Sequence, residues 1–260
     1  MSRFVFLLLL ACVSCQNVSK DAVTNYDLQT PLQIWKLPKE LDEISGFTMA
    51  NNETLFCNND EQGIIYTYNL EKSVIENSFT FGKNNDYEDV TLVSDSLFVL
   101  QSNGTLFCID KNKKITKITT FLNQKQDTEG LCYDKKKHRL LLACKNKVAK
   151  KISIYGFDLK SNQLLNQPVI SFSSEELSNK NFAPSGIAIH PLTETIFIIS
   201  SVGKSMVEVD YEGKILNEYS LNNKHFLQPE GIFITQNGDL FISNEGKNKK
   251  ANLLKFEFLQ

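Results

Sequence analysis

Five short motifs in the chain place a glutamate or a serine immediately before a glycine, or once before an aspartate, and an apolar run follows each motif. The residues at this position are Ser45, Glu88, Glu129, Ser185 and Glu230. Carboxylates that are brought together raise one another's pKa, and a bound cation removes that conflict. Because Ca²⁺ accepts roughly six to eight oxygen ligands in irregular geometry, we predict that Glu88, Glu129 and Glu230 bind a metal ion and that calcium is the cofactor.

The elements that must position these residues follow from the spacing of the motifs, which is 43, 41, 56 and 45 residues. A period near forty residues made of short strands is typical of propeller blades. Each unit contains short runs rich in Ile, Val, Phe, Tyr and Thr, and turn sequences such as Asn237-Gly238 separate them. The sequence therefore predicts an all-β fold, a five-bladed β-propeller, with six blades as the alternative.

The two irregular units make further predictions. The last unit supplies only three strands, which would leave an open sheet edge. A fourth strand is available at Pro31–Pro38, so we predict that this N-terminal strand closes the last blade as its outer strand. The long interval contains Ser173 followed by Glu176, a capping box that predicts a short loop-borne helix ending at Pro184.

Radial symmetry would gather the five motif positions at one end of a central channel. The ends of the second strands lie on the same face, and they carry Asn58, Asn59, Asp60, Gln101, Lys145, Ser200, Asn244 and Glu245. From these sets we predict ligand binding by Ser45, Ser185, Asn58 and Asn244. The acids just before the strands, Asp42, Glu43, Asp86 and Asp127, are expected on the rim, where they either contribute to the site or cap turns. In a second interpretation, each motif glutamate accepts backbone hydrogen bonds from the next blade and locks the ring.

The N-terminus has the pattern of an export signal. Arg3 precedes the unbroken apolar run Phe4–Ala11, which is too short to span a bilayer, since a spanning helix needs about 20 apolar residues. Cys12 and Cys15 both lie in sequences that resemble the bacterial lipobox, whose cysteine is acylated. We predict lipid attachment at Cys15, with Cys12 and a plain secretory signal as the alternatives. The chain then divides into a lipoprotein signal peptide (1–14), a tether (15–29) and a propeller domain (30–260).

Composition and the remaining residues narrow the classes of function. The formal net charge is −2, which gives no reason to expect a nucleic acid partner. His138, His190 and His225 are expected at the surface, and no Ser-His-Asp arrangement is legible. The cysteines that follow the signal lie inside apolar runs, so we expect free buried thiols, with Cys132 opposite a residue near Leu141.

The order of the motifs resembles the SdiA-regulated (YjiK-type) family of bacterial envelope proteins. "SGIAIHPLTETIFIIS", "EVDYEGKIL" and "PEGIFITQNGDLFISNE" carry most of this resemblance, which extends from about Leu37 to the C-terminus. The second motif departs from it, because Asp89 stands where glycine is usual. The resemblance implies a propeller at the cell envelope behind a membrane anchor or lipoprotein signal, with calcium bound in some members. It implies no established reaction.

Two functions of different class follow from these features. In the first, an envelope-anchored lipoprotein uses the propeller as a binding or scaffold platform for a small molecule or a protein, with calcium in the central channel. In the alternative, a metal-dependent hydrolase of lactonase or phosphoesterase type uses a channel cation to activate water, with Glu230, Asn58 and Asn244 around the ion. In both cases we expect a monomer that contacts the membrane through its lipid anchor.

Overall fold

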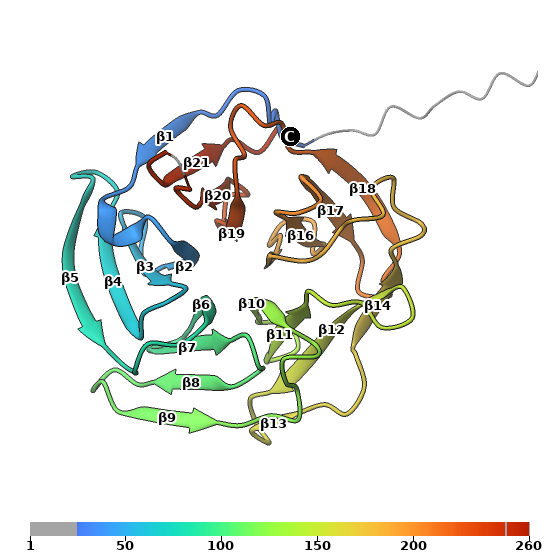
Figure 1. The fold of residues 1–260 in the computed structure, drawn as a ribbon, viewed down its shortest axis with the longest axis horizontal. Coiled ribbons are helices and arrows are strands. Elements are labelled where there is room, and N and C mark those ends of the chain that lie inside the picture. The colour runs from blue at the N-terminus through green and yellow to red at the C-terminus, as the bar shows by residue number, and fades with distance from the viewer. Residues whose placement is uncertain (1–24, 248, 260) are drawn as a thin grey trace, which may run out of the picture.

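The sheets of the protein are arranged around a central axis like the blades of a propeller (Figure 1). The computed structural model describes residues 25–247 and 249–259, so the predicted signal peptide, Cys12 and Cys15 lie outside the described residues. Five antiparallel sheets surround the axis, which confirms the five-bladed all-β propeller and makes the six-bladed alternative wrong.

Each blade begins with a strand at the axis and proceeds outward. Blade 1 contains β2 (Ile44–Met49), β3 (Thr54–Asn59), β4 (Ile64–Asn69) and β5 (Val74–Thr80). Blade 2 contains β6 (Tyr87–Val93), β7 (Ser96–Gln101), β8 (Leu106–Ile109) and β9 (Ile115–Ile118). Blade 3 contains β10 (Thr128–Asp134), β11 (Arg139–Cys144), β12 (Lys151–Asp158), β13 (Gln163–Leu164) and β14 (Ile170–Ser173). Blade 4 contains β15 (Gly186–Ile189), β16 (Ile196–Ser200), β17 (Ser205–Val209) and β18 (Ile215–Ser220).

Blade 5 closes the ring with both ends of the chain. It contains β19 (Pro229–Ile234), β20 (Leu240–Asn244), β21 (Asn252–Phe256) and, as its outer strand, β1 (Gln33–Lys36). Because β1 pairs antiparallel with β21, the predicted closure by the N-terminal strand is confirmed. The indole Nε1 of Trp35 in β1 donates to the carbonyl of Leu70 in blade 1 at 2.9 Å, which ties the two blades together.

The extra residues of the long unit do not form the predicted helix. Both β13 and β14 pair with β12, so two short strands take the place of a single outer strand in blade 3. Ser173, the predicted cap, pairs with Lys151 in the sheet, and turns and bends follow it. Leu177 and Phe182 are both buried in the core between blades 3 and 4. Residues five apart do not share one face of a helix, so burial of both overrides the local capping signal.

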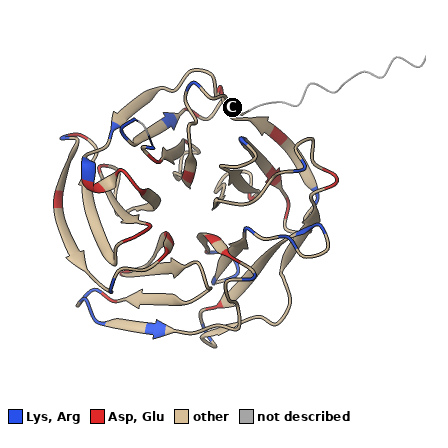
Figure 2. Cartoon of the chain, in the orientation of Figure 1, with Lys and Arg blue, Asp and Glu red and all other residues tan. Residues whose placement is uncertain are grey.

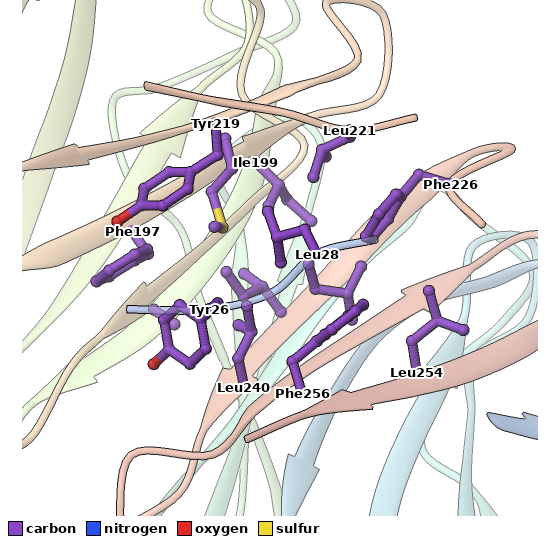
Figure 3. Packing of buried hydrophobic residues seen from close by; sticks show 14 of the residues in the cluster. Tyr26, Leu28, Phe197, Ile199, Tyr219, Leu221, Phe226, Leu240, Leu254 and Phe256 are labelled. Atoms are coloured by element: carbon purple, nitrogen blue, oxygen red, sulfur yellow. The ribbon is translucent and has the colours of Figure 1, made fainter. Parts of the chain in front are cut away.

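Apolar clusters between the blades hold the ring together. Figure 3 shows the cluster at blades 4 and 5, where Tyr26 and Leu28 pack against Phe197, Phe226 and Phe256. Tyr26 also donates its hydroxyl to the carbonyl of Gly238 at 2.7 Å. The described part of the predicted tether therefore belongs to this core. It contacts the propeller at the β19–β20 turn, on the face opposite the starts of the innermost strands.

One histidine does not lie where the sequence predicts. His138 is exposed, but His190 is completely buried beside Tyr26 and Phe258, so the expectation of a surface residue is wrong. Burial lowers the pKa of His190, and its Nδ1 accepts hydrogen bonds from the backbone N–H groups of Leu192 and Thr193. His190 is therefore a neutral core residue. The sequence did not reveal this burial, because His190 lies in a turn and the residues that cover it, Tyr26 and Phe258, come from the two ends of the chain.

Three of the four described cysteines are buried, as the sequence predicts. Cys57, Cys132 and Cys144 are buried free thiols, Cys108 is a partly buried one, and Cys132 lies opposite Leu141. No helix among the described residues is long and apolar enough to cross a membrane.

Candidate cation site at the acidic mouth

A β-bulge places the motif residue of four blades at the mouth of the channel. The pairing of the first and second strands slips between Ile44 and Gly46 in blade 1, and equivalent slips occur in blades 2, 3 and 5. The residues inside these slips include Ser45, Glu88, Glu129 and Glu230. A bulged residue leaves the ladder and its side chain is re-aimed. Here the four side chains line one cavity at the hub.

The glycine after the motif residue allows the innermost strands to approach one another closely. A Cβ atom on Gly46 would lie 2.2 Å from Asp89 Oδ1 and 2.6 Å from Asp89 Cα in the next blade. A Cβ atom on Gly186 would lie 2.4 Å from the carbonyl oxygen of Glu230. Any larger side chain at these positions would push the blades apart. The first residue of the motif therefore directs a polar side chain to the mouth, and the glycine allows the blades to pack closely.

Asp89, the residue that replaces glycine in the second motif, joins two blades. Its Oδ1 accepts from the backbone N–H of Val90 at 2.8 Å, and its Oδ2 accepts from that of Leu131 in blade 3 at 2.7 Å. Burial raises the pKa of Asp89 well above its usual range, while the two backbone N–H groups oppose that rise. In the second motif, therefore, an aspartate that accepts a hydrogen bond from the next blade replaces the glycine that elsewhere allows close packing.

Serine and amide side chains also join neighbouring blades. Ser45 donates to the carbonyl of Glu88 at 2.5 Å, Ser185 donates to that of Pro229 at 2.9 Å, and Asn58 donates to that of Tyr87 at 2.9 Å. Within the described residues, none of the three motif glutamates accepts a hydrogen bond from the backbone of a neighbouring blade. The locking role proposed for the glutamates is therefore filled by other side chains.

The cavity at this end of the channel, which we call the acidic mouth, has a volume of about 460 Å³. It is lined by eight carboxylates and two lysines, together with Ser45 and Gln228; the charged residues are Glu43, Asp60, Asp86, Glu88, Asp127, Glu129, Glu230, Glu245, Lys145 and Lys247. Figure 2 shows acidic residues at the inner ends of the blades. Carboxylates therefore outnumber lysines by eight to two in this cavity.

Burial and mutual repulsion disfavour ionisation of several of these carboxylates, among them Glu88, Glu129, Glu245 and Asp60. Burial, followed by the charge of Glu129, raises the pKa of Glu88 far above that of a free carboxyl. Burial also raises the pKa of Glu129, and Lys145 opposes the rise through an ion pair of 2.5 Å between Nζ and Oε1. Burial and the charge of Glu230 raise the pKa of Glu245 to about 8, and burial and the charge of Glu43 raise that of Asp60 to about 6.

Three of the eight carboxylates lie close enough together to hold a metal ion. One oxygen each from Glu43, Asp60 and Glu245 lie within 4.8 Å of one another. Glu43 precedes β2, Asp60 follows β3, and Glu245 follows β20, so the set joins blades 1 and 5. The buried Oδ1 of Asp60 has no hydrogen-bond partner, which leaves it free for a cation. The donors are all carboxylate oxygens, and these suit Ca²⁺ or Mg²⁺ better than zinc or copper.

The structure brings together some of the predicted site residues but not all. Glu88, Glu129, Glu230 and Ser45 line the acidic mouth, and Ser185 lines a cavity that adjoins it. Asn58 and Asn244 are completely buried outside both cavities, and their side-chain amides donate to Tyr87 and Asn252. The sequence predicts Glu43 on the rim and Asp60 and Glu245 at the ends of the second strands. The pairing of β2 with β3 sets Asp60 beside Glu43, which the spacing of the motifs does not reveal.

The other mouth of the channel differs in character. A cavity of about 670 Å³ opens there, and its lining includes Phe47, Met49, Leu92 and Phe233. Its buried charge is neutralised, because Asp134 pairs with Arg139 at 2.9 Å. The charged groups that could hold a cation are thus concentrated at the acidic mouth.

Fold and site define a five-bladed propeller with carboxylates from four blades at one mouth of its channel. The sequence model of the SdiA-regulated family matches residues 21–248, and the chain belongs to this family. No curated protein matches the chain.

Several solved structures share the fold. Glutaminyl cyclase from Myxococcus xanthus is 13% identical with a TM-score of 0.64, and the match covers 88% of this chain and 95% of that one. A luciferin-regenerating enzyme is 10% identical with a TM-score of 0.59, covering 88% and 96%. Virginiamycin B lyase from Staphylococcus aureus is 14% identical with a TM-score of 0.51, covering 81% of this chain and 66% of the lyase. At these identities the likeness shows the propeller fold alone.

Proposed function

We propose that the protein binds Ca²⁺ at the acidic mouth and serves as a non-catalytic binding platform at the bacterial cell envelope. The observation that carries this proposal is the set of eight carboxylates lining one cavity, three of which offer oxygens within 4.8 Å of one another. A bound cation would relieve the repulsion that contributes, after burial, to the raised pKa values of Glu245 and Asp60. The wide mouth leaves room for a ligand or a partner loop above the ion.

Glu43, Asp60 and Glu245 would hold the ion, and Glu88, Glu129 and Glu230 would supply further oxygen ligands. Gln228 donates a hydrogen bond from its amide to Glu245 and so orients one carboxylate. Glu129 already pairs with Lys145, so its use as a ligand would require the ammonium group to move. This is why we favour the trio of blades 1 and 5 over the trio of motif glutamates as the primary set.

The anchor is the second part of the proposal. The apolar run Phe4–Ala11 and the lipobox-like sequence ending at Cys15 support export and acylation. The first described residues contact the face opposite the acidic mouth, where Tyr26 donates to Gly238. An anchored propeller would therefore present its acidic mouth away from the membrane. Metabolic labelling with palmitate tests this: label should be lost in Cys15→Ser, and label retained there and lost in Cys12→Ser would move the anchor to Cys12.

A metal-dependent hydrolase is the second candidate, and Glu88 is the observation that favours it. Burial and the charge of Glu129 keep its carboxyl protonated near neutral pH, which is the state that a general acid requires. The cation would supply Lewis acidity, and this chain would supply the proton at Glu88.

Calcium titration and a substrate panel separate the two candidates. Isothermal titration of calcium into protein stripped with EDTA should give one specific site that is lost in the Glu43→Gln, Asp60→Asn, Glu245→Gln triple variant. Heat unchanged from a buffer blank would refute the cation site. Metal-dependent turnover on lactone or phosphoester substrates, abolished in Glu88→Gln, would favour the hydrolase over the platform.

A further inference from the structure

Blade 4 interrupts the acidic mouth. Blades 1, 2, 3 and 5 each contribute two carboxylates to the cavity, whereas blade 4, which is fully described, contributes none. At the positions where the other blades carry acids, blade 4 carries Ala183, Ser185 and Ser201. The mouth therefore has one sector without negative charge of its own.

Lysines from three successive blades line a cavity beside blade 4. This cavity of about 370 Å³ adjoins the acidic mouth, and Lys145 of blade 3, Lys204 of blade 4 and Lys247 of blade 5 all line it. Glu129, which pairs with Lys145, and Glu230 line it as well. Ser201 and the exposed side chain of Val202 lie in the same lining. We call this cavity the lysine sector. Lysines thus outnumber carboxylates by three to two in this cavity, whereas carboxylates outnumber lysines by eight to two in the acidic mouth.

The lysines retain donors for a ligand. Lys145 pairs with Glu129, and Lys204 donates to the carbonyl of Leu227. Each ammonium group has three N–H donors, so these contacts leave donors on both side chains. Burial and the nearby charge of Lys247 lower the pKa of Lys204, although Glu230 opposes this. An anion between Lys204 and Lys247 would relieve their repulsion.

We infer that the lysine sector is an oxyanion subsite, so that the ligand of this mouth carries a carboxylate or a phosphate group that contacts Lys204 and Lys247. The positions of the lysines support the subsite without a bound cation. Only the expectation that a cation strengthens anion binding rests on the proposed function. A cation at Glu43, Asp60 and Glu245 and an oxyanion at the lysines would be held by one cavity. The mouth would then recognise ligands by paired opposite charges.

Methyl phosphate and acetate are suitable probes, because their calcium salts are soluble. Each is titrated by calorimetry into the full-length protein, with EDTA and with saturating calcium. We expect lysine-dependent binding that weakens at least about 5-fold in Lys204→Met, Lys247→Met and is unchanged in Lys160→Met, an exposed lysine at the β12–β13 turn of the opposite face. Calcium should tighten it about 3-fold or more. The tighter probe identifies whether the oxyanion is a phosphate or a carboxylate.

A second variant guards against a folding defect in the lysine variants. Ser201→Glu introduces a carboxylate into blade 4 and should abolish anion binding while the melting temperature stays within the range of the wild type. Equal binding by the wild type and the double lysine variant would overturn the inference, as would calcium binding without any anion binding. Lysine-dependent anion binding without calcium binding would instead overturn the proposed function and leave the oxyanion subsite standing.

Discussion

Lys145 and Glu129 form an ion pair across the first hairpin of blade 3, with Nζ 2.5 Å from Oε1. Burial alone would lower the pKa of Lys145, but Glu129 and the neighbouring acids outweigh burial and raise it. The acidic mouth therefore contains a cationic side chain of its own, and this side chain also lines the lysine sector. Because Lys145 neutralises Glu129, this ion pair reduces the negative charge that is available to a bound metal ion.

Removing this lysine should strengthen calcium binding. In Lys145→Met the mouth gains one uncompensated charge, and an effect of about 1 kcal/mol, or roughly 5-fold in affinity, is expected for charges near a protein surface. Calorimetric titration at pH 8 measures it, with Lys160→Met as the control. An unchanged calcium affinity in Lys145→Met would show that the ion does not lie within reach of this pair.

The stability of the metal-free protein should fall as pH rises. Glu245 has a pKa of about 8 and Asp60 a pKa of about 6 in the folded protein, both above the values of about 4.3 and 3.9 typical of an unfolded chain. Between those values the folded state holds more protons than the unfolded state, so stability declines from about pH 4 to pH 8. The melting temperature in EDTA should therefore be higher at pH 5 than at pH 8, by at least about 3 °C.

Calcium should reverse this trend, because it binds the ionised carboxylates. The stabilisation by calcium is expected to be larger at pH 8 than at pH 5. The triple variant Glu43→Gln, Asp60→Asn, Glu245→Gln is the control, and both its pH slope and its calcium response should be reduced. A wild-type melting temperature in EDTA that rises between pH 5 and pH 8 would contradict the raised pKa values.

Asp89→Ala should destabilise the propeller. The substitution leaves the buried N–H of Leu131 without the acceptor that Asp89 Oδ2 provides at 2.7 Å, and an unsatisfied buried donor costs about 1–3 kcal/mol. Urea unfolding followed by circular dichroism measures the loss. Asp95→Ala, at an exposed position of the next hairpin turn, should cost under about 0.5 kcal/mol. Equal losses in the two variants would argue against a cross-blade role for Asp89.

The closure of the ring is tested by Trp35→Phe. The change keeps an aromatic ring against Phe241 but removes the hydrogen bond to Leu70 of blade 1. We expect a loss of about 1 kcal/mol. Tyr66→Phe, which removes a bond to Gln62 within blade 1, is the matched comparison and should cost less because that bond is partly exposed. A smaller loss in Trp35→Phe than in Tyr66→Phe would mean that the bond across blades 5 and 1 does not stabilise the closure.

The architecture could be predicted because the same weak motif recurs from unit to unit at a regular spacing. No single unit identifies a propeller, but the motifs at Ser45, Glu88 and Glu129 recur at the spacing of a blade. The three-stranded last unit also required a partner, and Pro31–Pro38 was available. The helix after Ser173 was wrong because a capping box is a local signal, and the burial of Leu177 and Phe182 outweighs it.

The site could be predicted only in part. Motif spacing placed Glu88, Glu129 and Glu230 at one mouth, since equivalent positions of a propeller face a common axis. The closer cluster of Glu43, Asp60 and Glu245 depends on strand register across two blades, which no motif encodes. The burial of Asn58 and Asn244 away from the mouth depends on packing between blades, which a short stretch of sequence likewise does not reveal.

Anomalous diffraction from crystals of the calcium-loaded protein tests the cation site most directly. A single strong calcium peak should lie within bonding distance of carboxylate oxygens of Glu43, Asp60 and Glu245 at the acidic mouth. A peak elsewhere in the molecule, or an empty mouth at millimolar calcium, would contradict the proposed cation site.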